Sequence, residues 1–307
     1  MMYLLFVLLA LVAVVIGVST KFMGSTDEVT FKGEIKYVSA DYQYVPLPVR
    51  VGRHELIHTD ALTNFDWRSV EGINYLTPIL NQHSPIYCGS CWAHSTVSMI
   101  ADRGNIMRKA STVATVPSVQ YILNCGQLVG SCNGGDVHAL LRWIYEQKRG
   151  VVDSTCQPYI ASSDQGCRDP MRTCYTCNYT GACYAVDDYP TMRISAYDRV
   201  IGDDKIMSEI ISNGPVVCYI NSDCIEQYQA GTISMYNETY GTGDKCETLK
   251  FDHAISIVGW GVRASDGLSF WTIRNSWGTF YGNGGFFDIV RGGAYQPLGC
   301  YTATPDV

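Results

Sequence analysis

Four side chains of this sequence could together attack and hydrolyse a carbonyl compound: a thiol, an imidazole and two carboxamides. Cys91 offers the thiol, in the run Cys-Gly-Ser-Cys-Trp, and His253 offers the imidazole. A thiolate attacks carbonyl carbon, and an imidazole within reach serves as its acid and base. The amide of Asn275 could fix the ring, and that of Gln82 could hold the oxyanion. We therefore take these four residues as the candidate catalytic set.

The odd number of cysteines singles out one thiol. Of thirteen cysteines, twelve could close six disulfides in an oxidising compartment and one would stay free. Cys91 precedes the stretch 92–109, whose apolar residues recur at nearly helical spacing, so we expect it at a helix N-terminus. The helix dipole and a nearby imidazolium would then lower its pKa and populate the thiolate. The alternative is that Cys91 is one more disulfide partner, although Cys88 is available for that purpose.

The base is chosen from six histidines. Two of them, His54 and His58, lie in a segment that we expect to be removed. His253 begins the strand-like run 254–258, and a strand end suits a site that faces a second lobe. His253 is therefore the candidate base; the alternative is a hydrogen-bonded core histidine.

Two amide side chains, Asn275 and Gln82, are candidates because the imidazole needs a hydrogen-bond acceptor and the oxyanion needs donors. Asn275 ends the apolar run 270–273, where its side chain could accept a hydrogen bond from the ring while Trp277 shields that bond from water. The alternative is a plain turn asparagine. Gln82 could donate its side-chain NH₂, together with the Cys91 backbone N–H, to a tetrahedral oxygen.

The elements that must position these residues are a helix first and a sheet second. The helix is expected within 92–109, and apolar runs between glycine-rich turns predict strands further along the chain. These runs are 216–220, 255–258, 270–273 and 286–290. The order predicts an α+β fold, and 307 residues are enough for two lobes with a sizeable core.

Charge and the N-terminal sequence limit the class of protein. The net charge is -7 and 47% of the residues are hydrophobic, so we expect no nucleic-acid partner. Residues 1–20 are uncharged and hold a short apolar run, which predicts a signal peptide; an uncleaved anchor is the alternative. Residues 21–61 show no long helical periodicity and are expected to form a short prosegment. No stable membrane association is expected after the signal peptide is removed.

With these residues assembled, the chain resembles the papain-like cysteine peptidases from Leu62 to Cys300. Four motifs occur in the family's order: Cys-Gly-Ser-Cys-Trp at 88–92, Cys-Asn-Gly-Gly at 132–135, Asp-His-Ala at 252–254 and Asn-Ser-Trp-Gly at 275–278. The resemblance implies a two-lobed catalytic domain over 62–307. A helical lobe at about 62–185 would face a β-barrel lobe at about 186–307, with the active-site cleft between them.

The resemblance also implies a substrate-binding backbone and a set of disulfides. The backbone of Gly134 and Gly135 would pair with extended substrate. The implied disulfides are Cys88–Cys132, Cys125–Cys167, Cys156–Cys174, Cys177–Cys183 and Cys218–Cys300. Cys224 and Cys246 are left for each other by elimination.

One departure from the family predicts the kind of cleavage. The interval between Gln82 and Cys91 is three residues longer than in most papain-like enzymes, and His83-Ser84-Pro85 is the expected insertion. This insertion and the surroundings of Tyr87 and His94 resemble the cathepsin X (also called Z) branch. Members of that branch remove single residues from C-termini.

A physical argument agrees with that resemblance. A protonated His83 could pair with a terminal carboxylate, and a loop stiffened by proline would block longer chains. We count Tyr87 and Trp277 with His83 among the substrate-binding residues. The alternative for His83 is a solvated loop histidine. His94 is expected to pack or hydrogen-bond within the structure and not to act as a second base.

The sequence thus predicts a cysteine carboxypeptidase for peptides and proteins with free C-termini, with no metal or organic cofactor. The spacing of Cys174 and Cys177 could form half a zinc site, but no second ligand pair stands at suitable spacing, so disulfides are expected. The competing functions are an endopeptidase of the same family and a catalytically silent secreted binding protein.

Export to the secretory pathway completes the prediction. Asn178 and Asn237 each begin an N-glycosylation sequon. A monomer is expected, located either in the lysosomal and endosomal compartment or outside the cell.

Overall fold

A computed structural model describes residues 63–147, 150–167, 174–226, 228–231, 233–234, 251–292 and 299–306. The predicted signal peptide and prosegment, with His54 and His58, lie outside these residues, as do Asn237 and Cys246. Within the described ranges, no helix combines the length and the apolar character that a membrane crossing requires.

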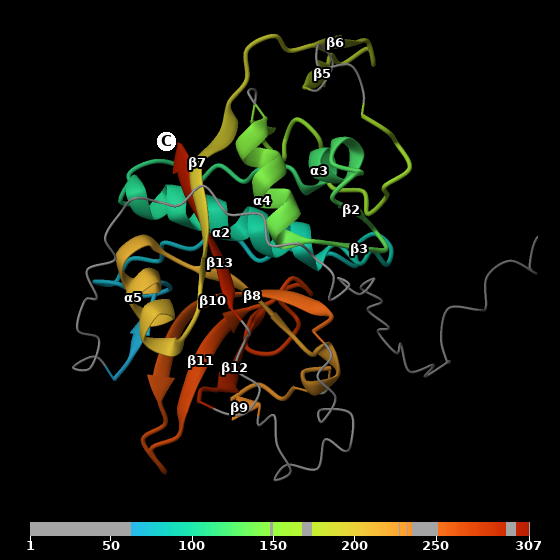
Figure 1. The fold of residues 1–307 in the computed structure, drawn as a ribbon. Helices are drawn as coiled ribbons and strands as arrows, with labels where there is room; N and C mark the ends of the chain where they lie inside the picture. Colours follow the sequence, from blue (N-terminus) through green and yellow to red (C-terminus); the bar gives the residue numbers. More distant parts are fainter. Residues whose placement is uncertain are drawn as a thin grey trace, which may run out of the picture. The chain divides into compact units, whose positions relative to one another are not determined.

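Helix α2, Cys91–Met107, is the central helix, and its residues from Cys91 to Asn105 are all buried. A helix that is buried on every side lies inside the protein and not on its surface. In Figure 1, α2 passes beneath α4 and beside β13. The helix begins one residue before the predicted stretch, so the expected place of Cys91 at a helix N-terminus is confirmed.

Three further α-helices and a short 3₁₀ helix have clear local causes at their ends. Ser118 accepts a hydrogen bond from Tyr121 N (3.0 Å) and Asp136 accepts one from Ala139 N (2.6 Å), so each caps a helix N-terminus. Gly214, with φ of 110°, ends the last helix. The helices are α3, Val119–Cys125; α4, Val137–Glu146; α5, Asp203–Asn213; and η3, Ser222–Cys224.

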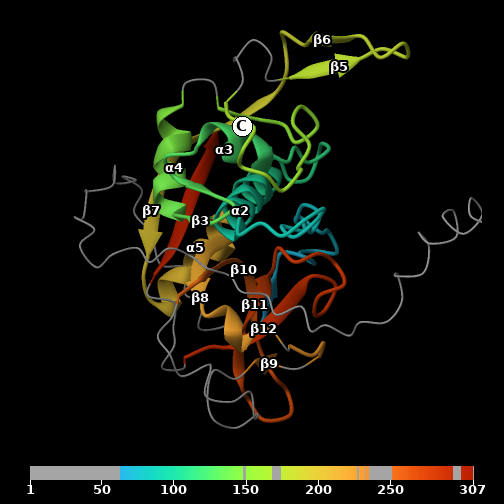
Figure 2. The same ribbon diagram turned by 90° about the vertical axis from the view of Figure 1, so that its right-hand side faces the viewer.

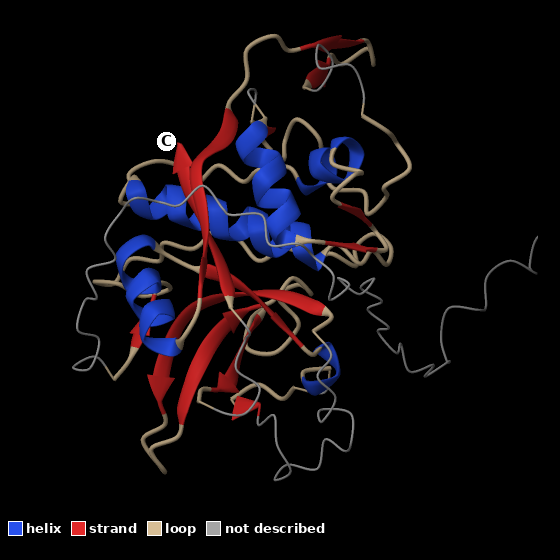
Figure 3. Cartoon of the chain, in the orientation of Figure 1, coloured by secondary structure: helices blue, strands red, loops and turns tan. Residues whose placement is uncertain are grey.

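The described strands form one large sheet and two small hairpins (Figure 3). The large sheet has the order β4-β7-β13-β8-β10-β11-β12-β9, and β1 also pairs with β10. Its strands are β1, Phe65–Asp66; β4, Val151–Val152; β7, Thr191–Val200; β8, Val216–Ile220; β9, Ile233–Ser234; β10, His253–Val262; β11, Ser269–Arg274; β12, Phe286–Val290; and β13, Cys300–Asp306. The hairpins are β2, Gly130–Ser131, with β3, Gly134–Gly135; and β5, Tyr175–Cys177, with β6, Cys183–Ala185.

Strand β10 is the element that brings the sheet to the central helix. Its sequence is apolar almost throughout, and all but its last residue are buried, as expected for a strand covered on both faces. It pairs antiparallel with β8 and with β11. His253 begins β10 and Asn275 directly follows β11, so this pairing places the two residues side by side.

Two hydrophobic clusters give the molecule its two lobes. One, which includes Trp92, Ile122 and Leu140, gathers around α2, α3 and α4. The other, which includes Trp260 and Trp271, fills the sheet side. The predicted α+β class is confirmed. In the described residues, no pairing joins β4 to β9, so the sheet runs as an open path and the expected barrel closure is not part of it.

The described residues hold five disulfides, and they join the pairs that the family resemblance implied. Cys88–Cys132 ties the segment before α2 to the β2–β3 hairpin, and Cys218–Cys300 links paired residues of β8 and β13. The others are Cys125–Cys167, Cys156–Cys174 and Cys177–Cys183. Cys224 is buried in the sheet-side cluster, and its predicted partner Cys246 lies outside the described residues. Five disulfides fit folding in the secretory pathway.

The β5–β6 hairpin, closed by the last of these disulfides, projects away from the rest of the helical lobe in Figure 2. Asn178 lies in its turn and is exposed, with its Oδ1 accepting from Thr180 and Ala182. The predicted glycosylation at Asn178 therefore stays a prediction at an accessible position.

Candidate active site

The candidate nucleophile lies where the central helix meets the sheet. Cys91 is 3% exposed, and its sulfur accepts hydrogen bonds from the backbone N–H groups of Ala254 in β10 and of Trp92. The preceding loop is held tightly, because Gly89 N donates to Cys132 O at 2.7 Å. A Cβ on Gly89 would lie 2.8 Å from that oxygen, so only glycine fits this approach.

The candidate base and its amide are brought together as expected. His253 Nε2 and Asn275 Oδ1 are 2.9 Å apart, and both residues are 3% exposed. An amide oxygen only accepts, so the ring donates through Nε2 and its Nδ1 is left for proton exchange. Ser276 N also donates to the same Oδ1 (2.8 Å), which fixes the orientation of the amide.

The indole of Trp277 covers this pair. Its centroid lies 4.9 Å from that of the His253 ring and 4.9 Å from that of Tyr281, and Trp277 is 5% exposed. A hydrogen bond kept away from water is stronger than an exposed one. The predicted shielding by Trp277 matches this arrangement.

Gln82 is fixed between the two lobes. Its Oε1 accepts from Ser276 Oγ at 2.6 Å, and its Nε2 donates to Cys88 O at 3.1 Å. The backbone is paired too, since Gln82 N donates to Ser276 O and Asn81 forms a bridge with Trp277. Because Oε1 accepts from Ser276, the orientation of the Gln82 amide is fixed. Its NH₂ group has two hydrogens, one of which bonds to Cys88 O, so the other remains for a ligand.

Burial opposes separate charges on the two reacting groups. It raises the pKa of the Cys91 thiol to about 11 and lowers the pKa of the His253 imidazole. The expectation of a lowered thiol pKa is therefore wrong, because burial raises the pKa by more than the backbone N–H groups at the sulfur lower it. Charge can still form on both groups at once, when the thiol proton moves to the ring.

Asp252 adds a carboxylate to this setting. It is 4% exposed, and its Oδ1 accepts from Ser222 N at 2.8 Å. Its charge raises the pKa of both Cys91 and His253. It therefore favours an imidazolium and disfavours an isolated thiolate.

His83 lies in the loop that follows Gln82. Its ring stacks on Tyr87 with centroids 4.7 Å apart and planes 7° apart, and it lies 6.3 Å from the Trp277 ring. Burial, followed by the charge of His253, lowers the pKa of His83 to about 4. The charge of His253 therefore reaches the predicted docking residue, and the lowered pKa makes His83 neutral at mildly acidic pH.

The described geometry is that of a known family. The family model described as "Papain family cysteine protease" matches residues 61–302. The chain belongs to the papain family of cysteine proteases. Cathepsin Z of Onchocerca volvulus is 35% identical over 255 residues, which cover 83% of this chain and 74% of that relative.

Solved structures show the same fold. The digestive procathepsin L2 proteinase from Tenebrio molitor larval midgut has a TM-score of 0.61 at 25% identity and covers 79% of this chain and 68% of its own. The proCathepsin B S9 from Trypanosoma congolense has a TM-score of 0.63 at 24% identity, covering 86% of this chain and 84% of its own. The papain-like fold that the sequence motifs implied is confirmed.

In this papain-family peptidase, one of the two predicted substrate-pairing glycines lies against the tryptophan that follows Cys91. Gly134 and Gly135 form β3, and a Cβ on Gly135 would lie 2.5 Å from the Trp92 indole. Trp92 itself is fully buried and donates from Nε1 to Ser131 O at 3.2 Å. Only glycine therefore fits at position 135.

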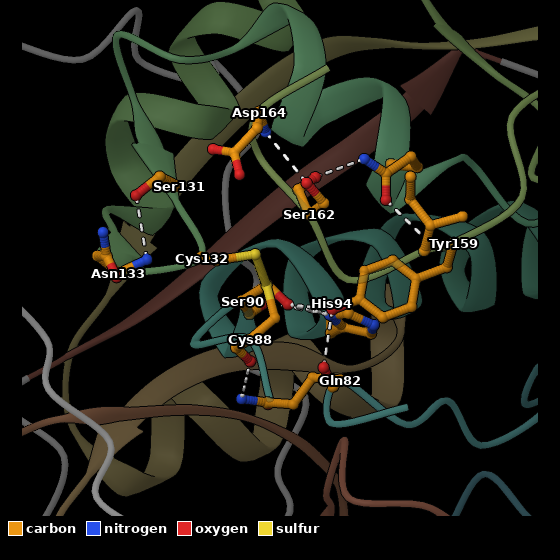
Figure 4. The surroundings of a disulfide bond; sticks show 12 residues. Gln82, Cys88, Ser90, His94, Ser131, Cys132, Asn133, Tyr159, Ser162 and Asp164 are labelled. Carbon is orange, nitrogen blue, oxygen red and sulfur yellow. Dashed lines mark hydrogen bonds between the residues drawn. A yellow bond between two sulfur atoms is a disulfide. The ribbon is translucent and has the colours of Figure 1, made fainter. Parts of the chain in front are cut away.

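The expectation for His94 is confirmed. It is 2% exposed, its Nδ1 lies 3.0 Å from Ser90 O, and its ring meets Tyr159 edge to face at 4.8 Å. Burial lowers its pKa to about 4. Figure 4 shows it beside Ser90 and the Cys88–Cys132 disulfide.

Three polar residues near the site were not assigned from the sequence. Ser276 and Asp252 lie inside motifs that the resemblance quoted, so attention to every polar position of those motifs would have found them. Tyr159, whose hydroxyl donates to Gln82 O at 2.8 Å, lies outside all four motifs and had no such signal.

Proposed function

We propose that Cys91, His253, Asn275 and Gln82 hydrolyse peptide bonds through a thioester. The Cys91 sulfur attacks the scissile carbonyl carbon while its proton passes to His253 Nδ1. The imidazolium then donates that proton to the departing amine. Water attacks the thioester, gives a proton to the ring and displaces the sulfur.

Asn275 and Gln82 have supporting roles in this scheme. The Oδ1 of Asn275 stabilises the ring as it becomes charged, since the two atoms already lie 2.9 Å apart. The remaining N–H of Gln82 and the Cys91 backbone N–H would stabilise the oxyanion in both steps.

We further propose that the enzyme is a carboxypeptidase that removes single residues. The observation that supports this is the position of His83: it follows the proposed oxyanion residue directly, stacks on Tyr87 and feels the charge of His253. A substrate whose scissile carbonyl lies at Cys91 would present a terminal carboxylate one residue further on. The relative named cathepsin Z, at 35% identity, supports the same assignment.

A terminal carboxylate would change the charge of His83. The pKa of His83 is about 4, and an opposite charge nearby raises the pKa of a histidine. Binding would therefore take up a proton, so affinity for free-acid peptides rises as the pH falls from 7 towards 4. A C-terminal amide carries no such charge, so its binding lacks this dependence.

The test compares one peptide with its C-terminally amidated twin. We expect kcat/KM for the free acid to exceed that for the amide by roughly 100-fold at pH 5, the size of a desolvated charge-assisted hydrogen bond. His83→Asn should remove most of this preference by raising KM for the acid. Asn64→Ala serves as a control, because the Asn64 side chain bonds to Val262 N, at the opposite end of β10 from His253.

The other outcomes identify the competing functions. Equal turnover of the two peptides by the wild type would contradict carboxylate docking and favour an endopeptidase. A Cys91 thiol that reacts with no alkylating agent and hydrolyses neither peptide would favour a silent binding protein. We propose peptides with free C-termini as substrates, action as a monomer, and a lysosomal, endosomal or extracellular location.

A further inference from the structure

Two buried side chains, His94 and Ser90, and the half-buried Tyr159 form a chain of hydrogen bonds that ends at the backbone of Gln82. His94 Nδ1 lies 3.1 Å from Ser90 Oγ, Ser90 Oγ lies 2.9 Å from Tyr159 Oη, and Tyr159 Oη lies 2.8 Å from Gln82 O. Figure 4 shows these four residues together, next to the Cys88–Cys132 disulfide. The proposed mechanism uses none of the three side chains.

The Gln82 carbonyl oxygen, at the end of this series of hydrogen bonds, fixes the direction of every bond in it. The carbonyl of Gln82 only accepts, so Tyr159 must donate its single hydroxyl hydrogen there. Tyr159 then accepts from Ser90, which uses the hydrogen of that serine. The Ser90 hydroxyl is left to accept from His94 Nδ1–H, which also faces Ser90 O at 3.0 Å. Donation therefore runs in one direction, from His94 to Gln82.

The same arrangement changes the start of α2. Ser90 is the N-cap residue, yet its side chain makes no capping hydrogen bond, although serine usually caps a helix by accepting from a first-turn N–H. Its hydroxyl is engaged with Tyr159 and His94 instead. The backbone oxygen of Ser90, and not its side chain, accepts from the first turn, from Ala93 N and His94 N at 3.0 Å each.

We propose that His94, Ser90 and Tyr159 are positioning residues for the peptide bond between Gln82 and His83. This proposal rests on the functions proposed above for Gln82 and His83. A turn of that peptide plane would move the Gln82 side chain, which is to stabilise the oxyanion, and the His83 ring, which is to dock the carboxylate. Holding its carbonyl through Tyr159 fixes both groups relative to Cys91, because Ser90 directly precedes that residue.

The predicted consequence is a separable effect on kcat and KM. Oxyanion stabilisation acts in the transition state, so misplacing Gln82 lowers kcat for every substrate. Carboxylate docking acts on bound substrate, so misplacing His83 raises KM for free-acid peptides alone. Loss of fold stability without loss of positioning would change neither quantity per active site.

Tyr159→Phe tests this, since it removes the hydroxyl and keeps the ring. We expect kcat to fall roughly 10-fold on both the free-acid peptide and its amidated twin, the scale of a small misplacement of a catalytic group. KM should rise about threefold or more for the acid and stay within about twofold for the amide. The alkylation rate of Cys91, which needs no oxyanion donor, should stay within about twofold.

Tyr228→Phe is the matched control. Its hydroxyl also contacts a backbone atom, Asp288 N at 3.2 Å, and is likewise half-buried, but in the sheet lobe. We expect it to leave kcat, KM and alkylation unchanged. His94→Phe should lower kcat by less than Tyr159→Phe does, because the bond between Ser90 and Tyr159 and the bond from Tyr159 to Gln82 O remain.

Wild-type kcat and KM per titrated thiol in Tyr159→Phe would overturn the proposal, whatever its melting temperature. A larger loss in His94→Phe than in Tyr159→Phe would overturn the order of the chain. Failure of carboxylate docking is a different result: the wild type would then treat acid and amide alike. The kcat loss of Tyr159→Phe on the amide would still test the positioning of Gln82.

Discussion

The two ends of helix α2 meet the sheet lobe in different ways. At its start, burial disfavours charge on the Cys91 thiol and on the His253 imidazole, and the Asp252 carboxylate raises the pKa of both groups. Further along, Asp102 pairs with Arg274 of β11 at 3.2 Å, and Arg103 pairs with Glu209 of α5 at 2.8 Å.

The charged residues of this half of the helix make further hydrogen bonds. Arg103 also donates to the backbone oxygens of Pro215, Gly214 and Ala303, and Thr77 donates twice to Asp102. All four charged side chains of the two pairs are at most 3% exposed. Buried pairs that keep their partners hold elements in one arrangement, whereas an unpaired charge there is costly.

This difference separates the residues that hold the two lobes together from the residues that are proposed to react. The lobes are held together by fixed charges several turns away from the nucleophile. At the reacting end, burial keeps both the thiol and the imidazole uncharged, so the two groups can form charge together. If this comparison is right, substitutions at the two ends should have opposite effects on activity and stability.

The largest expected effect comes from the reacting end. Cys91→Ser should lower kcat for peptide hydrolysis by at least about a thousandfold, since a hydroxyl at this position is a far weaker nucleophile than a thiolate. The free energy of unfolding should change by less than about 1 kcal/mol, because the substitution is nearly isosteric. Steady-state kinetics and urea unfolding measure the two quantities. Undiminished hydrolysis would remove Cys91 from the mechanism.

At the other end, Arg274→Met should lower the free energy of unfolding by about 3–5 kcal/mol, since it leaves Asp102 buried without its counter-charge. Burial already raises the pKa of Asp102 above 3.8. A protonated carboxyl needs no counter-charge. The loss in the free energy of unfolding should therefore be largest near pH 7 and should shrink as the pH falls towards the pKa of Asp102. Urea unfolding at several pH values measures it.

Arg142→Met is the control for that variant. Its i,i+4 pair with Glu146 has side chains that are 50% and 58% exposed, and such pairs contribute at most about 1 kcal/mol. The Arg274→Met protein should retain normal kcat per titrated thiol. A loss of stability no greater than that of Arg142→Met would mean that the buried pair does not hold the lobes together.

The sequence predicted the reacting end better than the charged one. Apolar patterns located 216–220 and 286–290, which are β8 and β12 as observed, and short motifs named His253 and Asn275, whose side chains meet in the structure. Local signals suffice for such features, because strand patterns and short motifs lie within one stretch of chain.

Long-range pairing explains what was missed. Asp102 and Arg103 read as ordinary polar positions of a helix, because their partners lie far away in the sequence at Arg274 and Glu209. The same holds for Tyr159, whose hydroxyl reaches Gln82 across 77 positions. The lowered thiol pKa was expected from the helix dipole, but the extent of burial, which reverses the shift, is a property of the assembled lobes.

The smallest expected effect concerns pH and tests whether the reacting end works as a neutral pair. Proton transfer from Cys91 to His253 leaves the net charge of the pair unchanged. A net charge appears only when the pair gains or loses a proton, and burial disfavours both events. It moves the pKa of His253 below 6.5 and that of Cys91 above 9.0.

The kcat/KM for an amidated peptide, which has no carboxylate for His83, should therefore vary by less than about threefold between pH 6.5 and pH 9.0. Intrinsic fluorescence over the same range checks that the fold is intact. A rate that climbs tenfold per pH unit across this interval would mean that the thiol titrates alone. The start of α2 would then need a charged partner after all, and the contrast between its two ends would be lost.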